Sequence, residues 1–293
     1  MAFGEADEPV PRPDEALVKV AAFSVNRGEL FQLESDRPGW RPGKDVAGLV
    51  VQAAADGSGP PACSRVVGHP PSAGWAEYVA VPTSSLAEIP ASVSVRSAAA
   101  LPLAGLTALR LLRASGATAG TRVLLTGASG GVGHCLVELA AAAGAEVTAV
   151  TATSDRGRRL AELGAAVVHD VRDAIGPFDV ALESTGGDVL PLALARVKPG
   201  GTLIWFGQAS RRPVTLDFFA FFDGPESASI RHFHYAGAPY GADLATLVRL
   251  TAAGRLHPEL GRVADWSETA AVLTDLRERR VRGNAVLTLE QNR

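Results

Sequence analysis

The hydrophobic positions before residue 95 form short runs that proline and glycine residues separate. These runs span residues 16–22, 46–51, 65–68 and 76–81. Short apolar runs between turn-forming residues are typical of β-strands. The first third of the chain is therefore expected to form a compact β-rich unit.

After residue 95 the pattern alternates between strand-like and helix-like segments. Strands are expected at residues 122–126, 147–151, 167–168, 178–182, 202–206 and 230–236. Helices are expected at residues 132–143, 156–163 and 189–197, the last of them ended by the Pro-Gly-Gly at 199–201. Each repeat takes ~20–30 residues, as a parallel βαβ crossover requires. A final strand–helix–strand run at 261–289 fits neither half and could return to the first.

A glycine-rich loop is the strongest local signal. Residues 123–133 read VLLTGASGGVG, so the loop follows a strand and opens a helix. Glycines permit a tight turn and a close approach to a pyrophosphate, whose charge the helix N-terminus favours. The segment predicts a dinucleotide site; the alternative is an ordinary strand-to-helix turn.

The same loop letters also fit the short-chain dehydrogenases, which use a Tyr-x-x-x-Lys pair. The chain has three lysines, Lys19, Lys44 and Lys198. No tyrosine lies four residues before any of them; those positions hold Glu15, Trp40 and Leu194. That family is therefore excluded.

Composition narrows the functional classes. The 293 residues are 47% hydrophobic and 20% charged, which excludes intrinsic disorder, and the net charge of -3 argues against a nucleic-acid partner. Cys63 and Cys135 cannot supply a four-cysteine zinc lobe. No signal peptide is visible, and the longest uncharged stretch, 123–137, is too short for a membrane span. A cytoplasmic protein without a membrane partner is expected.

Eight segments together resemble the medium-chain dehydrogenase/reductase superfamily, in its zinc-free quinone oxidoreductase and enoyl reductase branch. Residues 22–30 (AFSVNRGEL), 42–48 (PGKDVAG), 74–82 (GWAEYVAVP) and 98–108 (AAALPLAGLTA) are similar to motifs of that branch. Segments 125–133, 182–187, 199–207 and 282–287 follow in the same order.

The resemblance implies an α/β fold with two domains and an active-site cleft between them. A Rossmann domain with a doubly wound parallel sheet is expected at 97–261. A β-rich GroES-like catalytic domain is expected at 1–96 and 262–293. The chain begins later than most relatives, so this domain is expected to lack the opening strands.

Departures from the zinc-dependent relatives indicate a reaction without metal. Asn26 stands where those enzymes carry a catalytic cysteine, and Lys44 and Asp45 stand where they carry a His-Glu pair. The resemblance places Asn26 beside the nicotinamide, where its amide is expected to bind the substrate carbonyl or the ribose. The alternative is that Asn26 only fixes its loop.

The end of the second Rossmann strand predicts NADPH as cofactor. NAD-binding relatives carry an acidic residue there, whereas this chain has Thr151, Thr153 and Ser154 and then Arg156. Asp155 is expected to cap the next helix. Arginine binds phosphate through two parallel hydrogen bonds, so Arg156 is expected to hold the 2′-phosphate. The alternative is that these arginines only form an exposed basic face of the helix. In that case NADH, the less favoured cofactor, would be bound.

The resemblance also implies further cofactor contacts. They are Thr107, Gly130, Gly131, Val132, Thr185, Phe206, Gly207 and Asn284, the last in place of a usual lysine. His69 with Cys63 is a weak metal candidate. The aromatic run at Phe218, Phe219, Phe221 and Phe222 is expected to pack in the core or at a dimer interface, or to line an apolar pocket.

The predicted function is an NADPH-dependent reductase that transfers hydride to a quinone or an α,β-unsaturated carbonyl. Its substrate would be a small apolar or aromatic carbonyl compound, and the strand at 230–236 would join two subunits into a homodimer. The alternatives are a non-catalytic NADPH-binding sensor or structural protein of the zeta-crystallin type and, less favoured, a zinc alcohol dehydrogenase.

Overall fold

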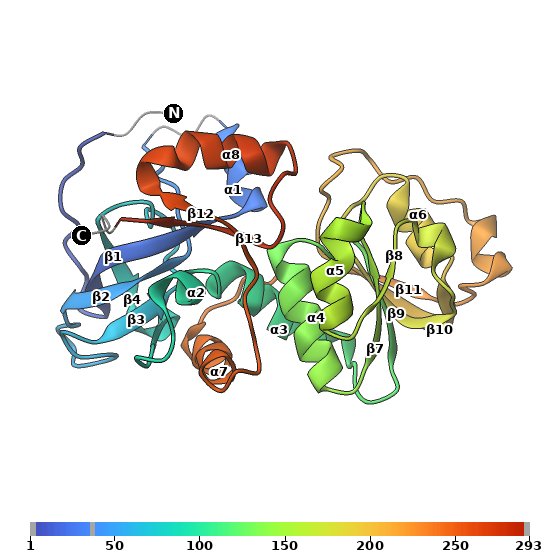
Figure 1. Cartoon of the computed structure of the whole chain (residues 1–293), viewed down its shortest axis with the longest axis horizontal. Coiled ribbons are helices and arrows are strands. Elements are labelled where there is room, and N and C mark those ends of the chain that lie inside the picture. The colour runs from blue at the N-terminus through green and yellow to red at the C-terminus, as the bar shows by residue number, and fades with distance from the viewer. Residues whose placement is uncertain (1–3, 36–38, 290–293) are drawn as a thin grey trace. The chain divides into compact units, whose positions relative to one another are not determined.

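The computed structural model describes residues 4–35 and 39–289 and divides the chain into two compact units (Figure 1). Unit 1 comprises Met1–Leu106 and Ala236–Arg293, and unit 2 comprises Thr107–Tyr235. The first boundary falls inside helix α3 (Pro102–Ser115). These bounds differ from the expected domain bounds because α7 (Gly241–Ala252) packs within unit 1, where Tyr240 N–H donates to the Ser84 carbonyl.

Unit 1 is built on a mainly antiparallel seven-stranded sheet with the order β12-β13-β1-β2-β3-β5, in which β4 also pairs with β1. Its strands are β1 (Glu15–Val25), β2 (Val46–Gln52), β3 (Arg65–Gly68), β4 (Tyr78–Pro82), β5 (Leu86–Glu88), β12 (Leu260–Asp265) and β13 (Asn284–Thr288). The C-terminal strand–helix–strand run therefore returns to the first part of the chain.

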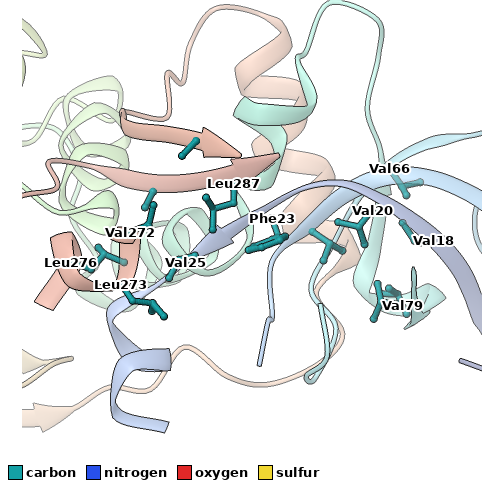
Figure 2. Packing of buried hydrophobic residues seen from close by; sticks show 14 of the residues in the cluster. Val18, Val20, Phe23, Val25, Val66, Val79, Val272, Leu273, Leu276 and Leu287 are labelled. Carbon is teal, nitrogen blue, oxygen red and sulfur yellow. The ribbon is translucent and has the colours of Figure 1, made fainter. Parts of the chain in front are cut away.

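The core of unit 1 lies along β1, which is apolar on both faces. Figure 2 shows Val18, Val20, Phe23 and Val25 of this strand among buried side chains from neighbouring elements. Around the sheet lie α1 (Arg27–Leu33), α2 (Val95–Ala99), α7 and α8 (Thr269–Arg277), with short 3-10 helices η1 (Thr83–Ser85) and η4 (Trp266–Glu268).

Unit 2 contains a six-stranded parallel sheet with the order β11-β10-β9-β6-β7-β8. Its strands are β6 (Arg122–Leu125), β7 (Glu146–Val150), β8 (Ala166–Val168), β9 (Phe178–Glu183), β10 (Val197–Trp205) and β11 (Ser229–His232). Its helices are α4 (Gly131–Ala142), α5 (Ser154–Glu162), α6 (Val189–Leu194), η2 (Val171–Asp173) and η3 (Phe219–Asp223).

The strand order of unit 2 reverses direction between β6 and β9. In doubly wound sheets, ligands bind beyond the carboxyl ends of the strands at such a switch point. The expected fold class, a doubly wound parallel sheet with a second β-rich unit, is confirmed. Among the described residues, no helix is long and apolar enough to cross a bilayer.

Three local expectations in unit 2 were wrong. Thr153, not Asp155, caps α5, because the helix begins at Ser154 and Asp155 lies in its first turn. Helix α6 ends at Leu194, and β10 runs through the Pro-Gly-Gly segment with a register shift between Val197 and Thr202. The edge strand β11 ends at His232, so His234 lies beyond it.

The aromatic run does not pack in the core as a whole. Phe218, Phe219 and Phe222 are exposed and contact one another edge to face around Phe218. Only Phe221 packs against the core of unit 2. Cys135 of α4 is buried, and burial raises the pKa of its thiol to about 12.

Candidate active site

The glycine loop of unit 2 connects β6 to α4 in a turn that only glycine permits at two positions. Gly127 has φ of 61°, and a Cβ there would lie 2.5 Å from Ser184 Oγ. A Cβ on Gly133 would lie 2.0 Å from the Ala128 carbonyl oxygen. Gly127 lets the loop approach the residues after β9, and Gly133 lets the first turn of α4 approach the loop.

Gly130 has a different role, because its conformation does not require glycine. It is the N-cap of α4, with φ of -83°, and an added Cβ would meet only the Gly127 carbonyl oxygen at 3.6 Å. A separation of 3.6 Å is an ordinary van der Waals contact, so a side chain at this position would not clash with the loop. Gly131 and Val132 begin this helix. Backbone N–H groups in the first turn of a helix lack intrahelical acceptors and suit a pyrophosphate, so these residues fit the dinucleotide that the sequence predicts.

Glu183 connects the loop after β6 with the loop after β9. Its Oε1 accepts hydrogen bonds from Thr126 Oγ1 at 3.0 Å and from Thr185 N–H at 2.7 Å, and Gly186 N–H donates to both carboxylate oxygens. Burial raises the pKa of Glu183, and these hydrogen bonds oppose the rise. One carboxyl group thus positions both loops at the switch point.

Sequence reasoning missed Glu183, although it lies inside the segment LESTGG at 182–187 that supported the family resemblance. The predicted residues Phe206 and Gly207 follow the adjacent strand. Phe206 N–H donates to the Glu183 carbonyl at 2.9 Å, and the Gly207 carbonyl accepts from Trp205 Nε1 at 2.6 Å. Thr185, Phe206 and Gly207 therefore lie at neighbouring strand ends.

The residues after β7 are arranged so that one arginine reaches the glycine loop. Arg156 Nε donates to Ser129 Oγ at 3.0 Å. Thr151 is buried and its hydroxyl donates to the Thr153 carbonyl at 3.1 Å. Thr153 caps α5, and Ser154 is exposed at the first position of this helix.

The other two arginines of α5 are held by acidic neighbours on the same helix. Arg158 pairs with Asp155 at 2.5 Å and Arg159 with Glu162 at 3.0 Å. Arg156 is therefore the arginine of this helix that is directed toward the predicted cofactor loop.

A buried polar cluster in unit 1 contains the other predicted catalytic position. Its centre is Asp45, whose side chain is fully buried. The carboxylate accepts from Ser24 Oγ at 2.6 Å, Asn26 Nδ2 at 2.8 Å and Leu103 N–H at 3.1 Å, and it lies 3.0 Å from His69 Nδ1. We refer to Ser24, Asn26, Asp45 and His69 as the Asp45 cluster.

Both amide hydrogens of Asn26 are used within this cluster. Nδ2 donates to Asp45 and also to Ser24 Oγ at 3.1 Å, while Ser24 donates its own hydrogen to Asp45. A carboxylate accepts and does not donate, which fixes the orientation of the Asn26 amide. A substrate oxygen could therefore accept a hydrogen bond from Asn26 Nδ2 only by replacing Ser24 Oγ, which accepts the longer of the two bonds.

Glu29 lies next to the cluster and carries a strongly shifted pKa. Its Oε2 accepts from Asn26 N–H at 2.9 Å, and its Oε1 has no hydrogen-bond partner among the described residues. Burial and, to a smaller extent, the charge of Asp45 raise the pKa of Glu29 from 4.5 to about 8, although the hydrogen bond from Asn26 N–H and the charge of Lys44 act in the opposite direction.

Asn284 is brought close to Asn26 by strand pairing. It is buried at the start of β13, and its Nδ2 donates to the Glu259 carbonyl at 3.1 Å. In the antiparallel register of β1 and β13, Val25 pairs with Ala285, so Asn26 and Asn284 follow at the same end. The sequence alone did not connect these two positions.

The predicted site residues therefore fall into two groups. Asn26 and Asn284 belong to unit 1, and the remaining residues belong to unit 2, where Thr107 is buried on α3. Cys63 is exposed whereas His69 is buried. No group of three His, Cys, Asp or Glu residues in the described part of the chain is placed to hold a metal ion.

Comparison with known proteins identifies the family. Residues 12–91 match the model of the alcohol dehydrogenase GroES-like domain, and residues 131–252 match that of the zinc-binding dehydrogenases. The quinone oxidoreductase of Mus musculus is 30% identical over 230 residues, which are 71% of this chain and 69% of that protein. The chain belongs to the medium-chain dehydrogenase/reductase superfamily. Within the superfamily it falls in the quinone oxidoreductase-like branch.

Two further similarities describe this member of the superfamily. The 2-methylene-furan-3-one reductase of Solanum lycopersicum is 32% identical over 224 residues, or 68% of this chain and 57% of that protein. The Escherichia coli quinone oxidoreductase complexed with NADPH shares the fold, with a TM-score of 0.86 and 21% identity over 98% of this chain and 94% of that one. The matched part of the chain covers 12%, 57% and 66% of the full length of the first three curated relatives.

Proposed function

We propose that this protein is an NADPH-dependent reductase that transfers hydride to a quinone or an α,β-unsaturated carbonyl without zinc. The observation that carries the proposal is the glycine loop at the start of α4, toward which Arg156 is directed by its hydrogen bond to Ser129. The names of the quinone oxidoreductase and 2-methylene-furan-3-one reductase relatives support the same substrate class.

NADPH is proposed over NADH because of the charge and donors at the end of β7. No carboxylate stands at Thr151 or Thr153 to accept from a ribose diol, and Asp155 pairs with Arg158. Arg156 carries a fixed positive charge on a guanidinium group, whose planar set of N–H donors matches the geometry of a phosphate. A 2′-phosphate would gain charge-assisted hydrogen bonds there.

Independence from zinc is proposed from the side chains at the positions of the relatives' ligands. Asn26 offers an amide that already donates to Asp45, and the ammonium group of Lys44 lies close enough to lower the pKa of Glu29. The fixed positive charge of Lys44 beside this position opposes the binding of a zinc ion, which is also a cation. Elemental analysis after dialysis is expected to give less than stoichiometric zinc; about one zinc per chain would contradict this part of the proposal.

The substrate class follows from the chemistry that this donor set allows. Bound NADPH supplies the hydride, and the protein orients the reactants and excludes water. Oxidation of a simple alcohol needs a strong acid to stabilise the alkoxide, which a metal usually provides. Hydride addition to a conjugated carbonyl moves charge onto an oxygen that hydrogen-bond donors can stabilise. Asn26 is proposed as one such donor.

A second candidate is NADPH binding without turnover. The observation that favours it is the use of both Asn26 amide hydrogens inside the buried Asp45 cluster. A panel of quinones, enones and simple alcohols, tested for NADPH oxidation, separates the two candidates. Turnover of quinones or enones with inert alcohols supports the reductase. Tight NADPH binding without any turnover supports the second candidate, and faster alcohol turnover contradicts both.

We also propose a cytoplasmic homodimer joined through β11. This strand pairs only with β10 in the described part of the chain, and all four of its residues are exposed. An open parallel edge exposes backbone groups that a second copy can pair with. The exposed Phe218, Phe219 and Phe222 come from the same β10–β11 connection and would add apolar contact area.

A further inference from the structure

The exposed imidazole of His169 lies at a strand end next to the predicted position of the cofactor 2′-phosphate. His169 directly follows β8, which is the neighbour of β7 in the sheet of unit 2. We propose that Nε2 of His169 hydrogen-bonds the 2′-phosphate of NADPH from the side opposite Arg156. This inference rests on the proposed cofactor and adds a second specificity-determining residue to the same site.

Strand pairing places His169 beside the end of β7. Thr151 N–H donates to the Val168 carbonyl at 3.0 Å, which continues the pairing of β7 and β8 by one residue. The next residue is His169, whose Nδ1 lies 3.2 Å from the Thr151 carbonyl oxygen and 3.5 Å from Thr151 Oγ1. The imidazole is therefore anchored to the first residue after β7.

The hydrogen bonds of Thr151 determine which ring nitrogen is available to a ligand. Thr151 Oγ1 donates its only hydrogen to the Thr153 carbonyl at 3.1 Å, so it can only accept from His169. The Thr151 carbonyl is also an acceptor, and Nδ1 of His169 therefore carries a hydrogen. Nε2 lies on the other side of this exposed ring and has no hydrogen-bond partner among the residues that the structure describes.

Gly157 brings the beginning of α5 onto the ends of β7 and β8. A Cβ at this position would lie 2.5 Å from Val167 Cγ1 and 3.1 Å from Thr151 Oγ1. Only a residue without a side chain permits such a close approach. Thr151 Oγ1 thus lies close both to the ring of His169 and to the backbone next to Arg156.

Arg156 and His169 approach the end of β7 from its two neighbouring strands. The order of these strands in the sheet is β6-β7-β8. Arg156 donates to Ser129 in the loop after β6, whereas His169 follows β8. Between them the chain after β7 carries the hydroxyl groups of Thr153 and Ser154. A 2′-phosphate beyond the end of β7 would therefore have a basic side chain on each side.

The acidic groups on the elements around His169 are paired with arginines. Helix α5, which packs on β8, carries two acid–arginine pairs besides Arg156. In the turn after β8, the Asp170 carboxylate accepts from Arg172 N–H at 2.8 Å and from Arg172 Nη1 at 2.9 Å. These contacts hold the pKa of Asp170 below its usual range, so its charge is constant near neutral pH.

The proposed contact needs one proton between the imidazole and the phosphate. When Nδ1 carries the only hydrogen of the ring, Nε2 is an acceptor, and a phosphate dianion is an acceptor as well. Either a charged ring donates to the dianion, or a phosphate monoanion donates to the neutral ring. Histidines and phosphate monoesters ordinarily titrate at about pH 6–7, so the contact becomes stronger as the pH falls through this range.

Isothermal titration with NADPH, NADH and adenosine 2′,5′-bisphosphate tests the proposal on His169→Asn. The asparagine amide can still donate to the Thr151 carbonyl but has no atom at the position of Nε2. The variant is expected to bind NADPH and the bisphosphate about tenfold more weakly at about pH 6, to lose much less at about pH 8.5, and to bind NADH as wild type does. His257→Asn, at an exposed histidine of unit 1, is the control and should match wild type.

His169→Gln provides a readout that a structural role would not move. Its longer side chain brings an amide N–H near the position of Nε2, so it is expected to restore part of the NADPH affinity without the strengthening at low pH. Equal losses for NADPH and NADH in His169→Asn, or unchanged NADPH affinity at both pH values, overturn the assignment of His169. A wild type that binds NADH more tightly than NADPH contradicts the proposed cofactor itself, and the assignment of His169 with it.

Discussion

Arg156 Nε donates a hydrogen bond to Ser129 Oγ over 3.0 Å, although the two residues are 27 positions apart. The contact crosses from helix α5 to the glycine loop and leaves the guanidinium group beside the predicted phosphate position. The other arginines of the helix are paired with Asp155 and Glu162. The structure thus singles out one of three arginines that are equivalent in the sequence.

Replacement of Arg156 by alanine is expected to weaken NADPH binding by about ten- to a hundredfold. One hydrogen bond to a charged group contributes ~1.5–3 kcal/mol, and NADH lacks the phosphate. Isothermal titration of both cofactors measures the difference. Arg158→Ala is the control, because Arg158 is exposed and paired with Asp155. Equal losses for NADPH and NADH would show that Arg156 supports the loop and not the phosphate.

Replacement of Asn26 by alanine is expected to lower quinone or enone turnover by ~10²–10³-fold, as for loss of one donor to developing charge. NADPH affinity is expected to remain close to that of wild type, since the amide donates to Asp45 and Ser24 of unit 1, whereas the glycine loop belongs to unit 2. Steady-state kinetics and cofactor titration separate the two quantities. Near-native turnover in Asn26→Ala would assign Asn26 to the loop structure through its bonds to Asp45 and Ser24.

Glu29 is expected to make stability depend on pH. Its pKa is about 8 in the folded chain against 4.5 when exposed, so the folded chain keeps a proton that the unfolded chain releases between these values. The free energy of unfolding therefore falls as the pH rises through this window. Each pKa unit corresponds to ~1.4 kcal/mol.

The variant Glu29→Gln cannot ionise, so its stability should lack this decline. Its advantage over wild type is expected to grow by ~3 kcal/mol between about pH 5 and about pH 8. Urea unfolding at a series of pH values measures it. Glu77→Gln, at an exposed position of the same unit, is the control. Parallel pH profiles for wild type and Glu29→Gln would contradict the assignment of a buried neutral carboxyl group.

Glu183→Gln is expected to lower both thermal stability and NADPH affinity. The amide oxygen can still accept from Thr126, Thr185 and Gly186, but the NH₂ group that replaces Oε2 would face the Gly186 N–H, donor against donor, and lose that bond. Each buried donor left without an acceptor costs ~1–3 kcal/mol. Thermal melts and cofactor titration report the two effects. The control is Glu146→Gln, at an exposed position on β7 of the same sheet, which should change neither quantity. If Glu183→Gln also changes neither, the two loops keep their positions without the hydrogen bonds of Glu183.

The homodimer proposal predicts that a charge on the open edge of unit 2 separates the subunits. Ile230 is 37% exposed on β11, so Ile230→Lys should be tolerated by the fold but oppose pairing of two edges. Phe218→Ser removes the centre of the exposed aromatic cluster. Light scattering at micromolar concentration is expected to show a dimer for wild type and monomers for the variants. Val263→Lys, on β12 of unit 1, is the control; a monomeric wild type would contradict the proposal.

The sequence by itself determined the elements whose signals are local. The apolar runs located most strands of both units, and residues 123–133 located a glycine loop between a strand and a helix. Loop glycines and alternating βαβ spacing act over a few residues, so they remain readable without tertiary structure. The first and last residues of the elements were not determined by the sequence. The cap at Thr153 and the strand through residues 199–201 depend on hydrogen bonds that override the local conformational preferences of Asp155 and of the Pro-Gly-Gly segment.

Only the tertiary structure decided the chemistry of the Asp45 cluster. Its donors come from β1, from the end of β3 and from Leu103 of α3, which is 58 residues away from Asp45. The pKa of Glu29 near 8 likewise results from complete burial beside a second carboxylate. No spacing in the sequence encodes such a meeting, because hydrogen bonds and desolvation depend on which segments the folded sheet brings together. Asn26 was visible as a substitution in a motif, but its role depends on neighbours that only folding supplies.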